Sequence, residues 1–168
     1  MIDLTFEVQQ YIHRDLRPHQ ESTLNQIRDS TEPIIVMEAP TGSGKTFHPA
    51  QLAYEGYKVL TLVRTKSLQG QYTQPPYSAR KVTGKANHPC NFGMVPTADL
   101  CKMSKRERQE VGCLDQCPYY VSCQQFLDSN LGSLNYAKHF LEDRPNGLVP
   151  SFNPEILFLD EAHQLSDL

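Results

Sequence analysis

The residue types between Glu38 and Thr46 suit the binding of a triphosphate. The segment reads Glu-Ala-Pro-Thr-Gly-Ser-Gly-Lys-Thr, with Ala39 where the strict phosphate-loop pattern has glycine. Its glycines let the backbone curl so that several N–H groups point at one anion. Lys45 can reach the β- and γ-phosphates, and the Thr46 hydroxyl can bind Mg²⁺. A glycine-rich turn that ends in Lys-Thr by chance is the alternative. The predicted nucleotide contacts are Ala39, Pro40, Thr41, Gly42, Ser43, Gly44, Lys45 and Thr46.

A second group with chemical potential is Asp-Glu-Ala-His at 160–163, directly after an apolar run. An Asp at the end of a buried strand, in a chain with a phosphate loop, can position Mg²⁺ together with Thr46. Glu161 beside it can polarise the water that attacks the γ-phosphate. The alternative to this catalytic interpretation is a strand cap with acidic loop residues. A small-molecule kinase would not need the Glu and the His, so the pattern favours hydrolysis of a nucleoside triphosphate.

Five cysteines lie between positions 90 and 123, and the rest of the chain has none. An odd number of clustered thiols, in a chain without a secretory signal, argues against a disulfide framework and for a metal or cluster site. Four thiolates suit a cubane iron–sulfur cluster or a tetrahedral zinc ion, although only Cys113 and Cys117 have the tight spacing typical of zinc. Free buried thiols are the third possibility. His88 is better explained as a loop histidine than as a ligand.

The elements that must position these groups follow from the apolar pattern. Short apolar runs predict strands at 34–37, 58–63, 131–134 and 155–159, helices at 20–30, 46–55 and 135–141, and a loop at 144–154. Strand–helix–strand order with short links gives parallel strands and right-handed crossovers. Because ligands bind at the carboxyl ends of such strands, we expect the chemistry at one edge of the sheet. The sequence thus predicts an α/β fold.

The segment 77–128 differs from the rest, because prolines interrupt it and it has little periodicity. It cannot bury much hydrophobic core of its own, so it needs a cross-link such as a bound metal or cluster. The 168 residues fit one α/β domain (1–76 and 129–168) with this segment as an insertion. The net charge of −3 does not indicate nucleic acid by itself. The basic stretch 102–108 suits either phosphates or a solvated helix face. No apolar run approaches the ~20 residues that span a bilayer, so we expect no membrane partner.

Several of these segments together resemble motifs of superfamily 2 helicases. Ala-Pro-Thr-Gly-Ser-Gly-Lys-Thr and Asp-Glu-Ala-His resemble motifs I and II of this superfamily, which tolerates Ala39, and Asp160–His163 points to the DEAH-type branch. Arg-Thr-Lys-Ser-Leu at 64–68 resembles motif Ia. Leu-Arg-Pro-His-Gln at 16–20 resembles the upstream adenine-reading element, which would give Gln20 the adenine edge.

The cysteine-rich insertion between motif Ia and the DEAH box resembles that of the XPD/DinG-type iron–sulfur DNA helicases. Cys-Pro-Tyr-Tyr at 117–120 and Leu-Asn-Tyr at 134–136 resemble two further elements of that family, and the resemblance runs from Arg17 to the end. It implies a P-loop NTPase with a RecA-like parallel sheet, helices on both faces, and a [4Fe-4S] insertion. The implied ligands are Cys90, Cys101, Cys113 and Cys117; a rival set includes Cys123 and omits Cys101.

The resemblance also implies a function. An ATP- and Mg²⁺-dependent motor would translocate 5′ to 3′ along single-stranded DNA and unwind forked duplex, with Lys45, Asp160, Glu161 and His163 as catalytic residues. Arg64, Thr65 and Gln71 would touch the DNA backbone. Tyr72, Tyr77, Tyr119 and Tyr120 would either stack on bases or pack in the core. An RNA helicase and a non-catalytic nucleic-acid-binding module with a cluster or zinc are the alternatives.

The position of the DEAH box near the end of the chain leads to one more expectation. Only five residues follow His163, which leaves no room for a second RecA-like lobe. Hydrolysis normally needs two lobes to close on ATP. We therefore expect a fragment that binds ATP without efficient turnover. With no secretory signal, we expect a cytoplasmic location, nucleoid-associated or nuclear in a eukaryote.

Overall fold

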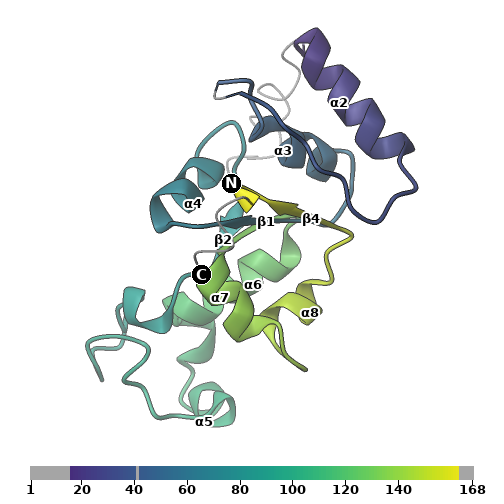
Figure 1. The fold of residues 1–168 in the computed structure, drawn as a ribbon. Helices are drawn as coiled ribbons and strands as arrows, with labels where there is room; N and C mark the ends of the chain where they lie inside the picture. Colours follow the sequence, from purple (N-terminus) through teal and green to yellow (C-terminus); the bar gives the residue numbers. More distant parts are fainter. Residues whose placement is uncertain (1–15, 41, 163–168) are drawn as a thin grey trace.

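A four-stranded parallel sheet forms the centre of the protein in a computed structural model, which describes residues 16–40 and 42–162 (Figure 1). Its strand order is β2-β3-β1-β4. Val59 of β1 aligns with Leu131 of β3 on one side and with Ile156 of β4 on the other. The strands predicted at 58–63, 131–134 and 155–159 are confirmed. The strand bounds are Val59–Val63 (β1), Arg80–Lys81 (β2), Leu131–Asn135 (β3) and Ile156–Leu159 (β4).

Helices cover both faces of this sheet, as predicted (Figure 1). Successive side chains of a strand point to opposite faces. Val59 and Val63 of β1 therefore pack against α2, α3 and α4, whereas Leu60 and Leu62 pack against α6, α7 and α8. The two packed faces fit a RecA-like P-loop fold. The helix bounds are Pro18–Asp29 (α2), Phe47–Tyr54 (α3), Lys66–Thr73 (α4), Lys105–Glu110 (α5), Pro118–Asp128 (α6), Tyr136–Glu142 (α7) and Leu148–Phe152 (α8).

The strand predicted at 34–37 is wrong. These residues form neither a strand nor a helix, and the side chains of Ile34 and Val36 are 79% and 90% exposed. An apolar β-branched run becomes a strand only where a neighbouring edge pairs with it. The central strand β1 takes both of its partners, β3 and β4, from later in the chain. The apolar pattern gave no information on which strands would pair.

The loop predicted at 144–154 contains the short helix α8, so this prediction is wrong in part. Pro150 is the third residue of the helix, where its missing N–H would have no intrahelical partner in any case. Asn153 ends the helix in the left-handed conformation, with φ of 51°. The helix forms because Leu148, Val149 and Phe152 are buried against the sheet.

The two ends of the segment 77–128 belong to the core of the sheet. Arg80 and Lys81 pair with β3, and Phe126 of α6 is fully buried. Between them lie the helix α5 and two short 3₁₀ turns, Lys85–Asn87 (η1) and Leu114–Gln116 (η2), joined by irregular chain (Figure 1). The cysteines are thus carried on an excursion whose ends are fixed by the sheet.

Candidate nucleotide-binding site

The phosphate loop has the backbone that its glycines predict. Gly42 and Gly44 adopt φ values of 82° and 85°, the left-handed region in which side chains are strained. A Cβ atom at Gly44 would also collide with the side-chain nitrogen of Gln20. The loop then enters α3 through a bond from the Phe47 amide to the Gly44 carbonyl (2.9 Å). Thr41, predicted to be part of this loop, lies outside the described residues.

Residues of the upstream Leu-Arg-Pro-His-Gln element hold this loop. Arg17 donates from Nη1 to the Gly42 carbonyl (3.3 Å), and His19 Nε2 lies 3.0 Å from the Ser43 carbonyl. Gln20 is buried and directs its side-chain amide to the same carbonyl (3.4 Å). The start of α2 therefore determines the shape of the loop from outside. The adenine contact of Gln20 remains a prediction.

Two side chains of the loop are arranged for an anion. Lys45 donates from Nζ to the Ala39 carbonyl (2.9 Å), so its ammonium folds back across the loop. The hydroxyl oxygen of Ser43 is buried and has no hydrogen-bond partner among the described residues. Buried hydroxyls rarely stay unpaired, so such an atom in a phosphate loop is consistent with a ligand oxygen as its partner.

Asp160 follows β4 and is held at three points. Its amide donates to the Leu62 carbonyl (2.9 Å), its own carbonyl accepts from the Tyr136 hydroxyl (2.9 Å), and its Oδ2 accepts from the Tyr72 hydroxyl (3.1 Å). The side chain of Thr46 lies near the same hydroxyl, where it partly offsets the raised pKa of Tyr72. Burial and the carboxylate of Asp160 raise the pKa of Tyr72, so its hydroxyl stays protonated. The structure thus brings Thr46 and Asp160 together.

Glu161 has a strained backbone beside this carboxylate. Its φ is 55°, a conformation that costs a non-glycine residue about 1–3 kcal/mol and that recurs at functional sites. Its side chain is only partly buried at the carboxyl edge of the sheet. The strained backbone thus marks Glu161 as a candidate functional residue. His163 lies outside the described residues.

Two of the residues predicted to contact DNA, Arg64 and Thr65, directly follow β1, and the third, Gln71, lies on α4. Arg64, Thr65 and Gln71 are exposed. Thr65 also caps α4, since its hydroxyl oxygen accepts from the Leu68 amide (3.2 Å). By contrast, Tyr72 and Tyr119 are 3% and 8% exposed, so both pack in the core and offer no stacking face.

Four of the five cysteines line one cavity in the insertion. Cys90, Cys101, Cys113 and Cys117 face it, whereas Cys123 packs on α6 against the core. All five are free thiols. Within residues 16–40 and 42–162, no three His, Cys, Asp or Glu side chains are close enough together to hold a single metal ion.

Groups around this cavity favour thiolates. Backbone N–H groups, first that of Phe92, lower the pKa of Cys90. Arg108 lowers the pKa of Cys101 through a hydrogen bond. The guanidinium of Arg108 is 5% exposed and donates to the Tyr120 hydroxyl (2.7 Å) and the Cys101 carbonyl (3.3 Å). Arg108 is therefore unavailable to a nucleic-acid phosphate, although it belongs to the predicted basic stretch. Sequence reasoning missed this role, because the charge pattern of 102–108 does not mark one arginine as buried.

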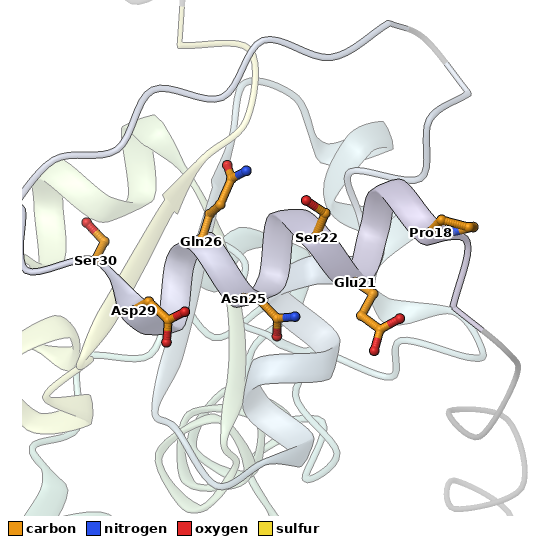
Figure 2. A pocket seen from close by; sticks show the side chains of 7 residues that line it. All are labelled: Pro18, Glu21, Ser22, Asn25, Gln26, Asp29 and Ser30. Carbon is orange, nitrogen blue, oxygen red and sulfur yellow. The ribbon is translucent and has the colours of Figure 1, made fainter.

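A hollow on the described surface lies along one face of α2. It is lined by residues from one helix and its C-terminal cap, from Pro18 to Ser30, and Figure 2 shows their polar side chains spread along that face. Gln20 and Leu24, which face the rest of the protein, do not line it. We assign no ligand to this hollow.

The sequence pattern of the family described as "Type III restriction enzyme, res subunit" matches residues 13–168. The chain belongs to this family. ResIII domains are helicase-like P-loop domains of superfamily 2, associated with ATP, Mg²⁺ and nucleic acid. The ResIII match includes both the phosphate loop and the strand that delivers Asp160. No curated protein and no solved structure matches the chain.

The ResIII family is broader than the iron–sulfur branch predicted from the sequence. Membership accounts for the parallel sheet, the phosphate loop and a helicase-type ATPase. It does not extend to the cysteines or to a choice between DNA and RNA. In the described part of the chain, no helix is both long and apolar enough to cross a bilayer.

Proposed function

We propose that this ResIII domain is the first motor lobe of an ATP-dependent DNA helicase of the XPD/DinG type. One observation carries the proposal: the Tyr72 hydroxyl donates to Asp160 of the DEAH box (3.1 Å) and lies near Thr46 of the phosphate loop. The two residues are far apart in the sequence and converge at the carboxyl edge of the sheet. That convergence is what a magnesium–nucleotide site requires.

The proposed roles follow from position. Lys45 binds the β- and γ-phosphates, Thr46 and Asp160 hold Mg²⁺, and Glu161 orients the attacking water. His163 transmits the nucleotide state to the DNA-binding residues. Gln20 reads adenine, and the main-chain N–H groups of residues 42–46 bind phosphate oxygens.

Nucleotide binding by the 168-residue chain tests the first half of the proposal, because binding does not depend on a second lobe. A fluorescent ATP analogue should bind more tightly with Mg²⁺ than without it. Lys45→Ala should weaken that binding at least tenfold, since a point charge on the phosphates is lost. Lys81→Ala, on the exposed strand β2, is the matched control and should bind like the wild type. Equal affinity of Lys45→Ala and wild type would refute the nucleotide site.

Nucleic-acid choice and direction need turnover, for which we propose that a second RecA-like lobe must close on the nucleotide. In a preparation that contains both lobes, single-stranded DNA should stimulate ATP hydrolysis more than RNA of the same sequence. A duplex with a 5′ tail should be unwound, and one with a 3′ tail should not. Stimulation by RNA alone would favour the RNA-helicase alternative. Absence of stimulation by either would favour a non-catalytic binding module.

The iron–sulfur part of the proposal rests on the cavity. Four thiols that face one space, with N–H donors at Cys90 and a buried guanidinium at Cys101, match the donor chemistry of a [4Fe-4S] cluster. Such a cluster would act as a staple for irregular chain. The exclusion of Cys123 from the cavity favours the ligand set Cys90, Cys101, Cys113 and Cys117.

Metal analysis of anaerobically purified protein tests this part separately. We expect about four iron and four sulfide per chain and a broad visible absorbance from thiolate-to-iron charge transfer. Cys117→Ser should lose most of the iron, whereas Cys123→Ser, on the same helix or its cap, should retain it. Stoichiometric zinc without iron would replace the cluster by a zinc site.

A further inference from the structure

Tyr72 lies between the two halves of the nucleotide site, although neither motif contains it. It belongs to α4, and its ring is buried with Val59, Val63 and Ala79. Its carbonyl accepts from the Ala79 amide (2.9 Å), so both the ring and the main chain are fixed. A side chain held in this way has little freedom to choose other partners.

The helix that carries Tyr72 is itself attached to the sheet. Gln69, 1% exposed, donates from its side-chain amide to the Ser133 carbonyl of β3 (2.7 Å). A buried amide bonded to a strand carbonyl is costly to break, because both groups would lose a partner away from water. The position of the Tyr72 hydroxyl is therefore set by the sheet rather than by the phosphate loop.

The direction of the hydrogen bonds is determined by chemistry. A carboxylate only accepts, so the Tyr72 hydroxyl donates its one proton to Oδ2 of Asp160 (3.1 Å). Its oxygen is then free to accept a further hydrogen bond on the side where Thr46 lies. Tyr72 thus holds the Asp160 carboxylate, with the Thr46 side chain near the same hydroxyl.

The two proposed metal ligands lie on either side of the Tyr72 hydroxyl. Mg²⁺ is a hard cation that binds oxygen, and it is often held by one or two side chains together with phosphates and water. A carboxylate and a threonine hydroxyl are therefore a donor set that fits the ion.

We propose that Tyr72 is a positioning residue that holds Asp160 ready for Mg²⁺ beside Thr46, and so sets how much Mg²⁺ the site needs to bind a nucleotide. This inference rests on the proposed ATP site. It concerns Tyr72 acting through Asp160 rather than on the nucleotide. Tyr136, which bonds to the main-chain carbonyl of Asp160, would help to fix the same strand end without touching the carboxylate.

The test is a Mg²⁺ titration of fluorescent-nucleotide binding to the full chain. Tyr72→Phe keeps the ring and removes only the hydroxyl. We expect the half-saturating Mg²⁺ concentration to rise about tenfold, a loss in the range of one charge-assisted hydrogen bond. Nucleotide affinity without Mg²⁺ should stay within twofold of wild type. Tyr57→Phe, a tyrosine 38% exposed on the surface, is the matched control and should not change either value.

Each outcome separates this inference from the proposed function. If the wild type binds nucleotide without any Mg²⁺ dependence, the proposed site fails, and this inference fails with it. If the wild type depends on Mg²⁺ and Tyr72→Phe has the same requirement, only the role of Tyr72 is refuted. An equal loss of affinity with and without Mg²⁺ would show a merely structural role. Tyr72→Met is the second variant should Tyr72→Phe not fold, and it should give the same Mg²⁺ shift.

Discussion

The nucleotide edge and the cysteine excursion differ in how their functional side chains are held. At the nucleotide edge, strands β1 and β4 deliver Asp160, and main-chain bonds of the sheet fix its position. In the excursion, Cys90 and Cys101 lie in irregular chain, and Cys113 and Cys117 flank the 3₁₀ turn η2. Regular structure leaves the first site with its ligands already together. The second depends on a few buried polar side chains and on whatever its thiols bind.

Helix α7 connects these two regions. At its first residue, the Tyr136 hydroxyl bonds to the Asp160 carbonyl. Two residues later, the ammonium of Lys138 donates to the carboxylate of Glu142 (2.6 Å) and to the hydroxyl of Tyr119 (3.3 Å). Tyr119 belongs to α6 and lies two residues after Cys117. The ammonium of Lys138 also lies 5.2 Å from the centre of the Tyr119 ring. One short helix thus contacts both the residue that follows β4 and helix α6, whose first residue, Pro118, lines the cysteine cavity.

The largest effect should come from breaking this connection at Lys138. Lys138→Met leaves the Glu142 carboxylate buried without its cation, which typically costs about 3–5 kcal/mol. Urea unfolding followed by circular dichroism measures the loss. In a Glu142→Gln background the same substitution should cost much less, because no charge is left unpaired. Equal costs in both backgrounds would show that the pair does not matter.

Arg108 offers the second-largest effect and tests the excursion alone. Arg108→Gln removes bonds to the Tyr120 hydroxyl and the Cys101 carbonyl, and we expect a loss of about 2 kcal/mol. Protease cleavage between residues 83 and 117 should rise, while nucleotide affinity should change less than twofold. Arg106→Gln is the control from the same helix. Its side chain is 89% exposed, so it should cost less than about 0.5 kcal/mol. Similar losses for both arginines would contradict a special role for the buried one.

A smaller effect is expected in the free energy of unfolding as the pH is lowered. Burial acts to raise the pKa of Glu142, but the hydrogen bond and charge of Lys138 outweigh it and leave that pKa below its ordinary value of 4.5. A lowered folded-state pKa gives stability that is present above pH 4.5 and is lost as the pH falls through the folded value. Unfolding at several pH values should therefore show a steeper decline below pH 4.5 for wild type than for Glu142→Gln. Parallel curves would exclude this contribution.

The contrast between the two regions also explains what the sequence could predict. The strands 58–63, 131–134 and 155–159 and the helices at 20–30 and 46–55 follow from local apolar pattern, and they position Lys45, Thr46 and Asp160. The segment 34–37 has the same pattern but no partner in the sheet, and strand pairing is a non-local property. Tyr72 was unpredictable as a site residue, because a tyrosine on a helix next to a strand is also an ordinary core residue.

The buried polar contacts of the excursion were equally invisible in the sequence. Arg108 stands in a run of charged residues whose other arginine, Arg106, is almost fully exposed. On helix α7 the charged Lys138 is buried, whereas the apolar Phe140 and Leu141 are exposed. This is the reverse of what residue type alone indicates. Which charge is buried depends on the side chains brought over it from elsewhere in the chain, here Tyr119 and Tyr120.

The smallest effect should be found where α2 meets the phosphate-loop helix α3. Arg28 forms an ion pair with Glu55 at the end of α3, and the two side chains are 29% and 24% exposed. Partly solvated pairs of this kind contribute about 0.5 kcal/mol and weaken as salt rises. A double-mutant cycle with Arg28→Ala and Glu55→Ala should give that coupling in low salt. The coupling should be smaller in 0.5 M NaCl, because the Debye length falls to roughly 4 Å there. Nucleotide affinity should hardly change, since Arg17, His19 and Gln20 hold the loop at the opposite end of α2. A coupling above about 2 kcal/mol would mean that the nucleotide side, too, depends on single polar contacts, and the contrast with the cysteine excursion would disappear.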